Sequence, residues 1–83
     1  MKVAPLRPKL VDYLRKHNLV SKFEKQIEIF KLDPRHPSLH NELLEPKERG
    51  IRSFRIDLSY RVLFIYDQEN NEVEILAITQ HYR

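Results

Sequence analysis

Arginine is the residue type in this chain best suited to hold a phosphate, and four arginines lie close together in the second half of the sequence. They fall within thirteen residues: Arg49, Arg52, Arg55 and Arg61. Asp57 is the one acidic residue in that stretch. A guanidinium donates two parallel hydrogen bonds to a phosphate, and a local basic patch is the electrostatic footprint of a nucleic-acid-binding protein. This stretch is therefore the first candidate for contact with a nucleic-acid backbone.

Arg55 and Arg61 flank a tight connection between two predicted strands, and the strand register decides what they can do. If the paired residue numbers sum to 116, the two side chains share a face and lie directly opposite each other. If they sum to 117, the side chains point to opposite faces. Two facing arginines repel unless an anion lies between them, so the first register predicts a phosphate site. The alternative to a phosphate site is that both arginine side chains are solvated or form ion pairs with Asp57, Glu72 or Glu74.

Histidine and tyrosine supply the candidates for proton transfer. His81 and Tyr82 stand next to each other near the end of the sequence, where a histidine is a ready proton donor or acceptor at neutral pH and a tyrosine can stack on a base. The alternative is a frayed tail, or a tyrosine packed on the sheet. His36 and His40 are four residues apart, but Pro37 disfavours a regular helix through them. We expect no metal site there, and histidines that cap or solvate a surface loop.

The composition excludes several classes of chemistry. The 83 residues include no cysteine, which excludes disulfides, thiolate catalysis and cysteine-based zinc sites. A single glycine, Gly50, excludes glycine-rich phosphate loops. No apolar run approaches the roughly 20 residues of a membrane span, and no apolar signal core follows Met1. We therefore expect a cytoplasmic protein. We also expect a single domain over residues 1–83, because two domains would each be too small to bury a core.

The first half of the sequence predicts two amphipathic helices in an antiparallel hairpin. Four apolar residues recur at helical spacing in the first helix: Leu6, Leu10, Val11 and Leu14. Three form a stripe on the second helix: Phe23, Ile27 and Phe30. The first helix should end near His17–Asn18, and the second should begin at a capping box of Ser21 and Glu24. Asp33-Pro34 should end it, and the early prolines limit any strand before the hairpin to about residues 2–4.

After Gly50 the apolar period changes from about 3.6 to 2, which predicts strands. Three are expected in an antiparallel meander: Ile51–Asp57, Tyr60–Asp67 and Val73–Thr79. A short helical or irregular segment through Leu44 and a charged loop at 46–50 precede them. The apolar run 62–65 predicts a central strand covered on both faces. The fold class is α+β, with an N-terminal helical hairpin packed on a small antiparallel β-sheet.

Several short segments, in this order, resemble the RelE/ParE superfamily of bacterial toxins from type II toxin–antitoxin pairs. They are Asp33–His40, Gly50–Ile56, Tyr60–Phe64, Ile75–Ile78 and the terminal His81. The resemblance covers roughly residues 20–83, and the terminal His-Tyr resembles the YoeB branch in particular. It implies a RelE-like toxin domain held inactive by a cognate antitoxin, an acidic and partly disordered chain that folds as it binds.

Many members of the family are ribosome-dependent mRNA endonucleases. The resemblance implies a reaction without metal or other cofactor, in which the RNA 2′-OH attacks the adjacent phosphorus and leaves a 2′,3′-cyclic phosphate and a 5′-OH. By its place in Tyr60-Arg61-Val62, Arg61 matches the phosphate-stabilising arginine. His81 and Tyr82 match the terminal pair that acts as acid or base and positions the RNA base. Three arginines are expected to contact the RNA backbone: Arg49, Arg52 and Arg55.

The chain departs from the YoeB pattern at the general base. That branch has a glutamate in the segment matching His36–Leu39, where this sequence has Ser38. Glu42, Glu45 or His81 are the candidates to take its place. The ParE branch shares the fold but targets gyrase and is not a nuclease. A gyrase-directed toxin and a catalytically inactive binding module are therefore the alternative readings.

Overall fold

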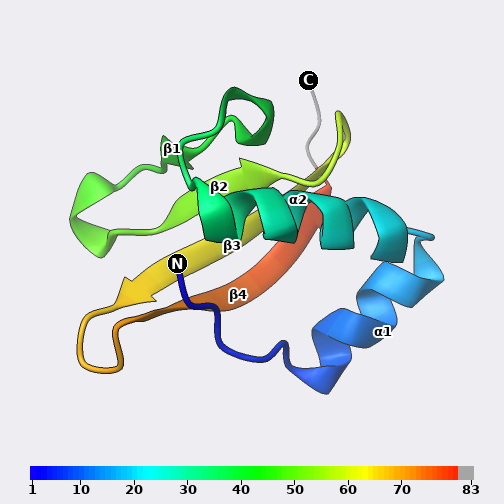
Figure 1. Ribbon diagram of the computed structural model, residues 1–83, viewed down its shortest axis with the longest axis horizontal. Helices are drawn as coiled ribbons and strands as arrows, with labels where there is room; N and C mark the ends of the chain where they lie inside the picture. The colour runs from blue at the N-terminus through cyan, green and yellow to red at the C-terminus, as the bar shows by residue number, and fades with distance from the viewer. Residues whose placement is uncertain (81–83) are drawn as a thin grey trace.

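The computed structural model describes residues 1–80 and has two helices packed against one face of an antiparallel sheet (Figure 1). The helices are α1, Pro8–Lys16, and α2, Val20–Leu32. The sheet has the order β1-β2-β3-β4, with β1 at Glu42–Leu43, β2 at Arg52–Arg55, β3 at Tyr60–Asp67 and β4 at Glu72–Gln80. The expected α+β class, helical hairpin and three-stranded meander are confirmed. The sequence did not predict β1.

The helical hairpin is organised by buried Leu19. α1 ends at Lys16, and the left-handed Asn18 (φ 54°) turns the chain. Leu19 is 1% exposed, donates its N–H to the Leu14 carbonyl at 2.8 Å and stands immediately before α2. The predicted capping box at Ser21 is wrong, because burial of a leucine is worth about 1.5–3 kcal/mol against about 1 kcal/mol for a cap. Ser21 therefore lies inside the first turn of α2.

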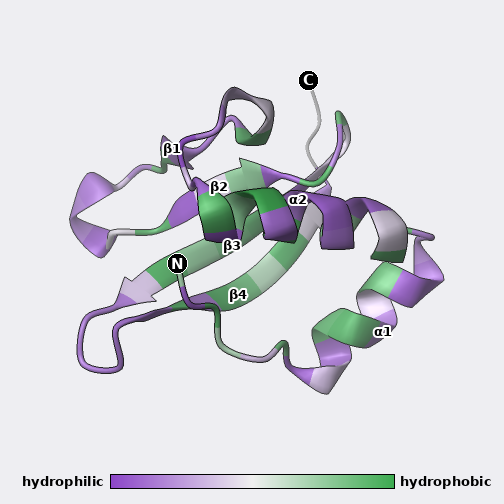
Figure 2. Cartoon of the chain, viewed as in Figure 1, coloured by the Kyte–Doolittle hydropathy of each residue, from purple (hydrophilic) through white to green (hydrophobic). Residues whose placement is uncertain are grey.

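The core lies between α2 and the helix-facing side of the sheet. The predicted stripe of Phe23, Ile27 and Phe30 is buried, and Figure 2 shows apolar residues along α2, β3 and β4. The rings of Phe30 and Phe54 stack at 4.9 Å between centroids, and Phe64 packs edge-on to Phe30 at 5.1 Å. α2 ends at Leu32, and the backbone of Asp33 is extended before Pro34, as predicted.

The two faces of the central strand β3 differ, which corrects the prediction that both are covered. Val62 and Phe64 are buried on the helix-facing side, whereas Leu63 and Ile65 on the other face are partly exposed. No helix in residues 1–80 covers that second face, which we call the open face.

The segments around the sheet are short. At the N-terminus, Val3 forms a single parallel bridge with Val73, as the prolines after it allow. The charged loop at 46–50 contains a single 3₁₀ turn, Lys47–Arg49, and ends at Gly50, whose φ of 67° favours glycine. Neither α1, with 9 residues, nor α2, with 13, is long and apolar enough to cross a bilayer, and no other helix in residues 1–80 is either.

Candidate active site

The register between β2 and β3 places two arginines face to face. Arg55 pairs with Arg61, and Phe54 pairs with Val62, so paired residue numbers sum to 116. Because Phe54 and Val62 enter the core, the two arginines project on the open face. Of the two registers that the sequence left open, this is the one that predicts a phosphate site.

Asp57 fixes this register at the turn. The connection is a three-residue loop closed by the Ile56 N–H, which donates to the Tyr60 carbonyl at 2.9 Å. The Asp57 carboxylate accepts hydrogen bonds from the backbone N–H groups of Ser59 at 2.8 Å and Tyr60 at 2.9 Å. Burial raises the pKa of Asp57, but these hydrogen bonds and the Lys22 ammonium, 3.1 Å away, lower it by more, and the net pKa lies below its usual value. The charged carboxylate therefore holds the loop that makes the arginines face each other.

The Arg55 backbone is held from the helix side by Gln26. This glutamine is 8% exposed, and its amide donates to the carbonyls of Arg55 at 2.8 Å and Ser38 at 3.3 Å. The short β1 pairs no further along β2 than Ser53, so the side chain of Gln26 satisfies a carbonyl that a longer strand would bond. No sequence pattern indicates this contact, because Gln26 lies in a helix whose other polar residues are exposed.

The unpredicted strand β1 brings a carboxylate to the arginines. Glu42 pairs with Ser53 in the sheet, which places it on the open face, where it forms an ion pair with the Arg61 guanidinium. The Arg61 side chain is 14% exposed and that of Glu42 is 53% exposed. The carboxylates that the sequence offered instead pair elsewhere: Asp57 with Lys22, Glu72 with Lys2 and Glu74 with Arg7. Arg61 therefore pairs with one of the two glutamates proposed as the base.

These residues line a surface pocket of about 420 Å³. Its lining consists of His40, Asn41, Glu42, Arg55 and Arg61. The pocket combines two guanidinium groups for an anion with one carboxylate that can accept a proton. Ser53 lies beside it in the sheet, fully buried, and its hydroxyl has no hydrogen-bond partner among the described residues. Neither Asn41 nor Ser53 is recognisable as a site residue from the sequence, because the place of both depends on the position of β1.

The other predicted site residues lie outside this pocket. Arg52 alternates to the opposite side of β2 and donates its Nε–H to Asn41 Oδ1 at 2.9 Å. Arg49 and Glu45 are exposed near the charged loop and do not line the pocket. His81 and Tyr82 lie outside the described residues.

The histidine pair of the 36–40 segment has the role expected of loop residues. His36 caps a 3₁₀ turn at Pro37–Leu39 by accepting the Ser38 N–H at its Nδ1 atom. His40 follows that turn in a left-handed conformation with φ 46°. Within residues 1–80, no three histidine, aspartate or glutamate side chains converge in a group that could hold a metal ion.

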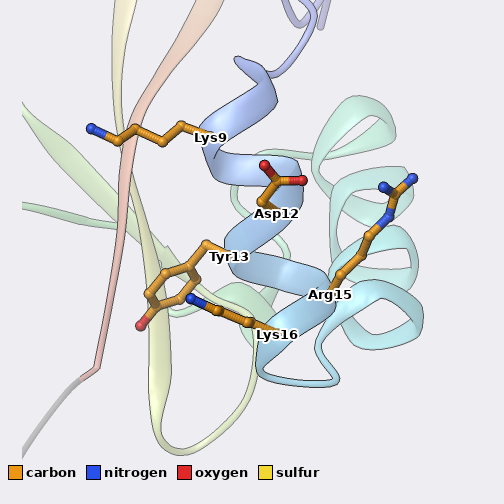
Figure 3. Close-up of a pocket in the computed structure, with 5 residues that line it drawn as sticks. All are labelled: Lys9, Asp12, Tyr13, Arg15 and Lys16. Atoms are coloured by element: carbon orange, nitrogen blue, oxygen red, sulfur yellow. The ribbon is translucent and has the colours of Figure 1, made fainter.

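A larger surface pocket of about 660 Å³ lies along α1 (Figure 3). Five residues of that one helix line it: Lys9, Asp12, Tyr13, Arg15 and Lys16. Figure 3 shows Lys9, Tyr13 and Lys16 projecting to one side of the helix and Arg15 to the other. The Tyr13 ring stacks on His17 with centroids 4.1 Å apart. This pocket contains none of the predicted site residues.

Comparison with known proteins gives a partial sequence match and a match over the full fold. No protein-family model matches this chain. Over 45 residues the chain is 49% identical to an uncharacterized protein of Haemophilus influenzae; the match covers 54% of this chain and 43% of the relative, so it spans less than half of that relative's length.

The structural match is to a YoeB/ParE toxin from Agrobacterium tumefaciens. It covers 99% of this chain and 100% of that toxin, with a TM-score of 0.72 and 20% sequence identity. The order of elements and the antiparallel meander agree with the fold that the sequence resemblance implied. The chain therefore shares the α+β fold of this YoeB/ParE toxin.

Proposed function

We propose that this protein is the toxin of a type II toxin–antitoxin pair and cleaves mRNA on the ribosome without a metal ion. The observation that carries the proposal is the facing pair of Arg55 and Arg61 with Glu42 beside them on the open face. Phosphodiester cleavage needs cations for the charge on the phosphorane and a base for the attacking hydroxyl. The pocket of about 420 Å³ holds both kinds of group.

The arginines bind the scissile phosphate. Arg55 and Arg61 are directly opposite cross-strand neighbours, a spacing of about 4.5–5.5 Å between Cβ atoms, which costs free energy through like-charge repulsion. A phosphate between them removes that repulsion and accepts charge-assisted hydrogen bonds from both. In the ion pair with Glu42, Arg61 is the less exposed residue, so water screens its charge less than that of Glu42.

Glu42 acts as the general base. Its carboxylate takes the proton of the 2′-OH while that oxygen attacks the adjacent phosphorus, and the P–O5′ bond breaks. The products are a 2′,3′-cyclic phosphate and a 5′-oxygen that takes a proton from His81. Tyr82 stacks on the neighbouring base. The roles of His81 and Tyr82 rest on the sequence resemblance alone.

The ion pair between Glu42 and Arg61 is the arrangement of these two side chains in the protein without RNA. An incoming phosphate competes with the Glu42 carboxylate for the Arg61 guanidinium. The displaced carboxylate then lies next to that phosphate, where it can take the proton of the attacking 2′-OH. Most of the Glu42 side chain is exposed, at 53%, so it can reorient at little cost. The same pair compensates the charge of the largely buried Arg61 side chain until substrate binds.

A cognate antitoxin and the ribosome are the proposed partners, in the cytoplasm. Residues 1–41 carry nine basic and four acidic residues, so the helical hairpin has a net positive charge. Such a surface suits an acidic segment that folds on binding. Co-expression with the neighbouring gene product and affinity purification tests this; recovery of the protein with no small acidic partner would contradict it.

Mapping of mRNA 5′ ends in cells that express the protein tests the activity. Wild-type protein should arrest growth and create new 5′ ends within coding sequences, and Arg61→Gln should abolish both while the protein stays folded. Arg15→Gln is the matched control, because it removes the same charge from an exposed position on α1 outside the pocket. Growth arrest without new 5′ ends would overturn the nuclease proposal and favour a gyrase-directed toxin.

A further inference from the structure

A second basic pocket lies next to the candidate active site, across the segment His40–Asn41. Its volume is about 360 Å³. Its lining consists of Arg35, His36, Pro37, His40, Asn41 and Arg52. None of these six residues is acidic, whereas the active-site pocket contains Glu42. The second pocket therefore offers an anion two guanidinium groups and no competing carboxylate in its lining.

The guanidinium of Arg52 is held in place by its neighbours. Its Nε–H donates to Asn41 Oδ1 at 2.9 Å, and Asn41 Nδ2 donates in turn to the Pro34 carbonyl at 2.9 Å. Within residues 1–80, neither Arg35 nor Arg52 forms an ion pair with a carboxylate. A guanidinium fixed before binding loses less side-chain entropy when a ligand arrives.

His36 adds an imidazole side chain to this pocket. The Ser38 N–H donates to His36 Nδ1 at 3.2 Å, and the Ser38 hydroxyl lies 2.9 Å from the same atom. A backbone N–H can only donate, so Nδ1 is an acceptor and the ring proton is on Nε2. The charged and imidazole groups of the pocket thus present N–H donors, which is the complement of phosphate oxygens.

We propose that this second pocket binds another phosphate of the same RNA strand whose scissile phosphate lies between Arg55 and Arg61. The inference rests on the proposed function and names how its substrate is held. Arg52 and Arg55 are three positions apart on β2, about 10 Å, and point to opposite sides of the sheet, so one phosphate cannot contact both. His40 and Asn41 line both pockets, so a strand that passes over this segment reaches both.

RNA is a better candidate ligand than an acidic protein segment, because the two pockets adjoin each other at His40 and Asn41. A polynucleotide carries a phosphate at every residue, so a chain engaged at Arg61 necessarily presents further phosphates nearby. An acidic peptide has no such obligatory spacing. The segment from Arg35 to His40, which the sequence resemblance marked but the catalytic mechanism does not use, gains a role as a substrate-positioning element.

Binding of uncleavable RNA by the purified full-length chain tests the proposal. The ligands are a 2′-O-methyl dinucleotide, which has one internal phosphate, and a longer single-stranded 2′-O-methyl RNA. Arg35→Ala and Arg52→Ala should each weaken binding of the longer RNA several-fold and reduce the slope of log K against log salt by about 0.7. Binding of the dinucleotide should not change. Arg52→Lys should restore much of the slope, because it keeps the charge but loses the Asn41 contact.

Arg15→Ala is the matched control, since Arg15 is an exposed arginine of α1 that lines neither pocket. Thermal unfolding of each variant shows that the fold is intact. Wild-type affinity and salt slope in both Arg35→Ala and Arg52→Ala would overturn the proposal, whether or not the protein cleaves mRNA. Loss of antitoxin binding with unchanged RNA binding would also overturn it and assign the pocket to the protein partner.

If the wild-type protein cleaves no mRNA but the length-dependent RNA binding requires Arg35 and Arg52, the nuclease proposal fails and the second phosphate pocket stands. If cleavage occurs normally while the variants bind the longer RNA like the wild type, the pocket proposal fails alone. The two proposals therefore have distinguishable failures.

Discussion

The two faces of the sheet differ in the residues that they carry and in the contacts that hold those residues. The helix-facing side buries Phe54, Val62 and Phe64 against α2, and its contacts are apolar and numerous. The open face carries Arg55, Arg61 and Glu42, whose arrangement costs stability through facing charges and is held by a few polar contacts. The difference indicates that one side of the sheet stabilises the fold and that the other side carries the residues of the proposed site.

A substitution on the covered face should have the largest effect on stability. Phe54 is fully buried and packs against Phe30 and Phe64. Phe54→Ala should lower the free energy of unfolding by about 3–5 kcal/mol, as measured by urea denaturation. Arg55→Ala, at the next residue but on the open face, should change it by only about 0.5 kcal/mol or less. Equal losses for the two variants would show that the faces do not differ in this way.

Gln26 links the two faces and should have an intermediate effect. Gln26→Ala leaves the carbonyls of Arg55 and Ser38 without their side-chain donor, at a cost of about 1–3 kcal/mol. The same variant should weaken RNA binding more than its loss of stability explains, because the Arg55 backbone shifts. Denaturation and RNA titration of one sample measure both. Lys25→Ala, an exposed neighbour on α2, is the control and should change neither quantity.

The smallest expected effect is a change in pH dependence at the turn. The pKa of Asp57 is lowered in the folded protein, so its contribution to stability is fully present above the unfolded value, about 3.9, and is lost as pH falls through the lower folded value. Asp57→Asn should therefore flatten the fall of unfolding free energy below about pH 4. Chemical denaturation at a series of pH values measures it. An unchanged pH profile would show that this carboxylate does not hold the β2–β3 turn, and Asp12→Asn is the matched control on α1.

Much of the fold was predictable because it depends on local periodicity. The bounds of β3 and the end of α2 before Pro34 agree with the sequence prediction, since a change of period and a proline are local signals. The predicted start of α2 was wrong, because the burial of Leu19 contributes more free energy than a capping box at Ser21 would.

The candidate site was predictable only in part because it depends on long-range contacts. Arg61 was identified from the sequence, but its approach to Glu42 requires β1, a strand of two residues with no alternating pattern. The register of Arg55 and Arg61 was left open, because it depends on whether the Asp57 carboxylate closes a three-residue loop. The pairing of Asn41 with Arg52 depends in the same way on how the chain enters β1.

We propose that RNA is cleaved on the open face with Glu42 as the base, and the decisive experiment measures the cleavage rate of ribosome-bound mRNA by Glu42→Gln. Glutamine keeps the shape of the side chain but cannot take a proton at neutral pH. Glu42→Gln should lower the rate by about 10²–10⁴-fold with RNA binding retained, while Glu45→Gln, at the other glutamate of this segment, should cleave like the wild type. Wild-type cleavage by Glu42→Gln, or a comparable loss in Glu45→Gln, would show that Glu42 is not the base.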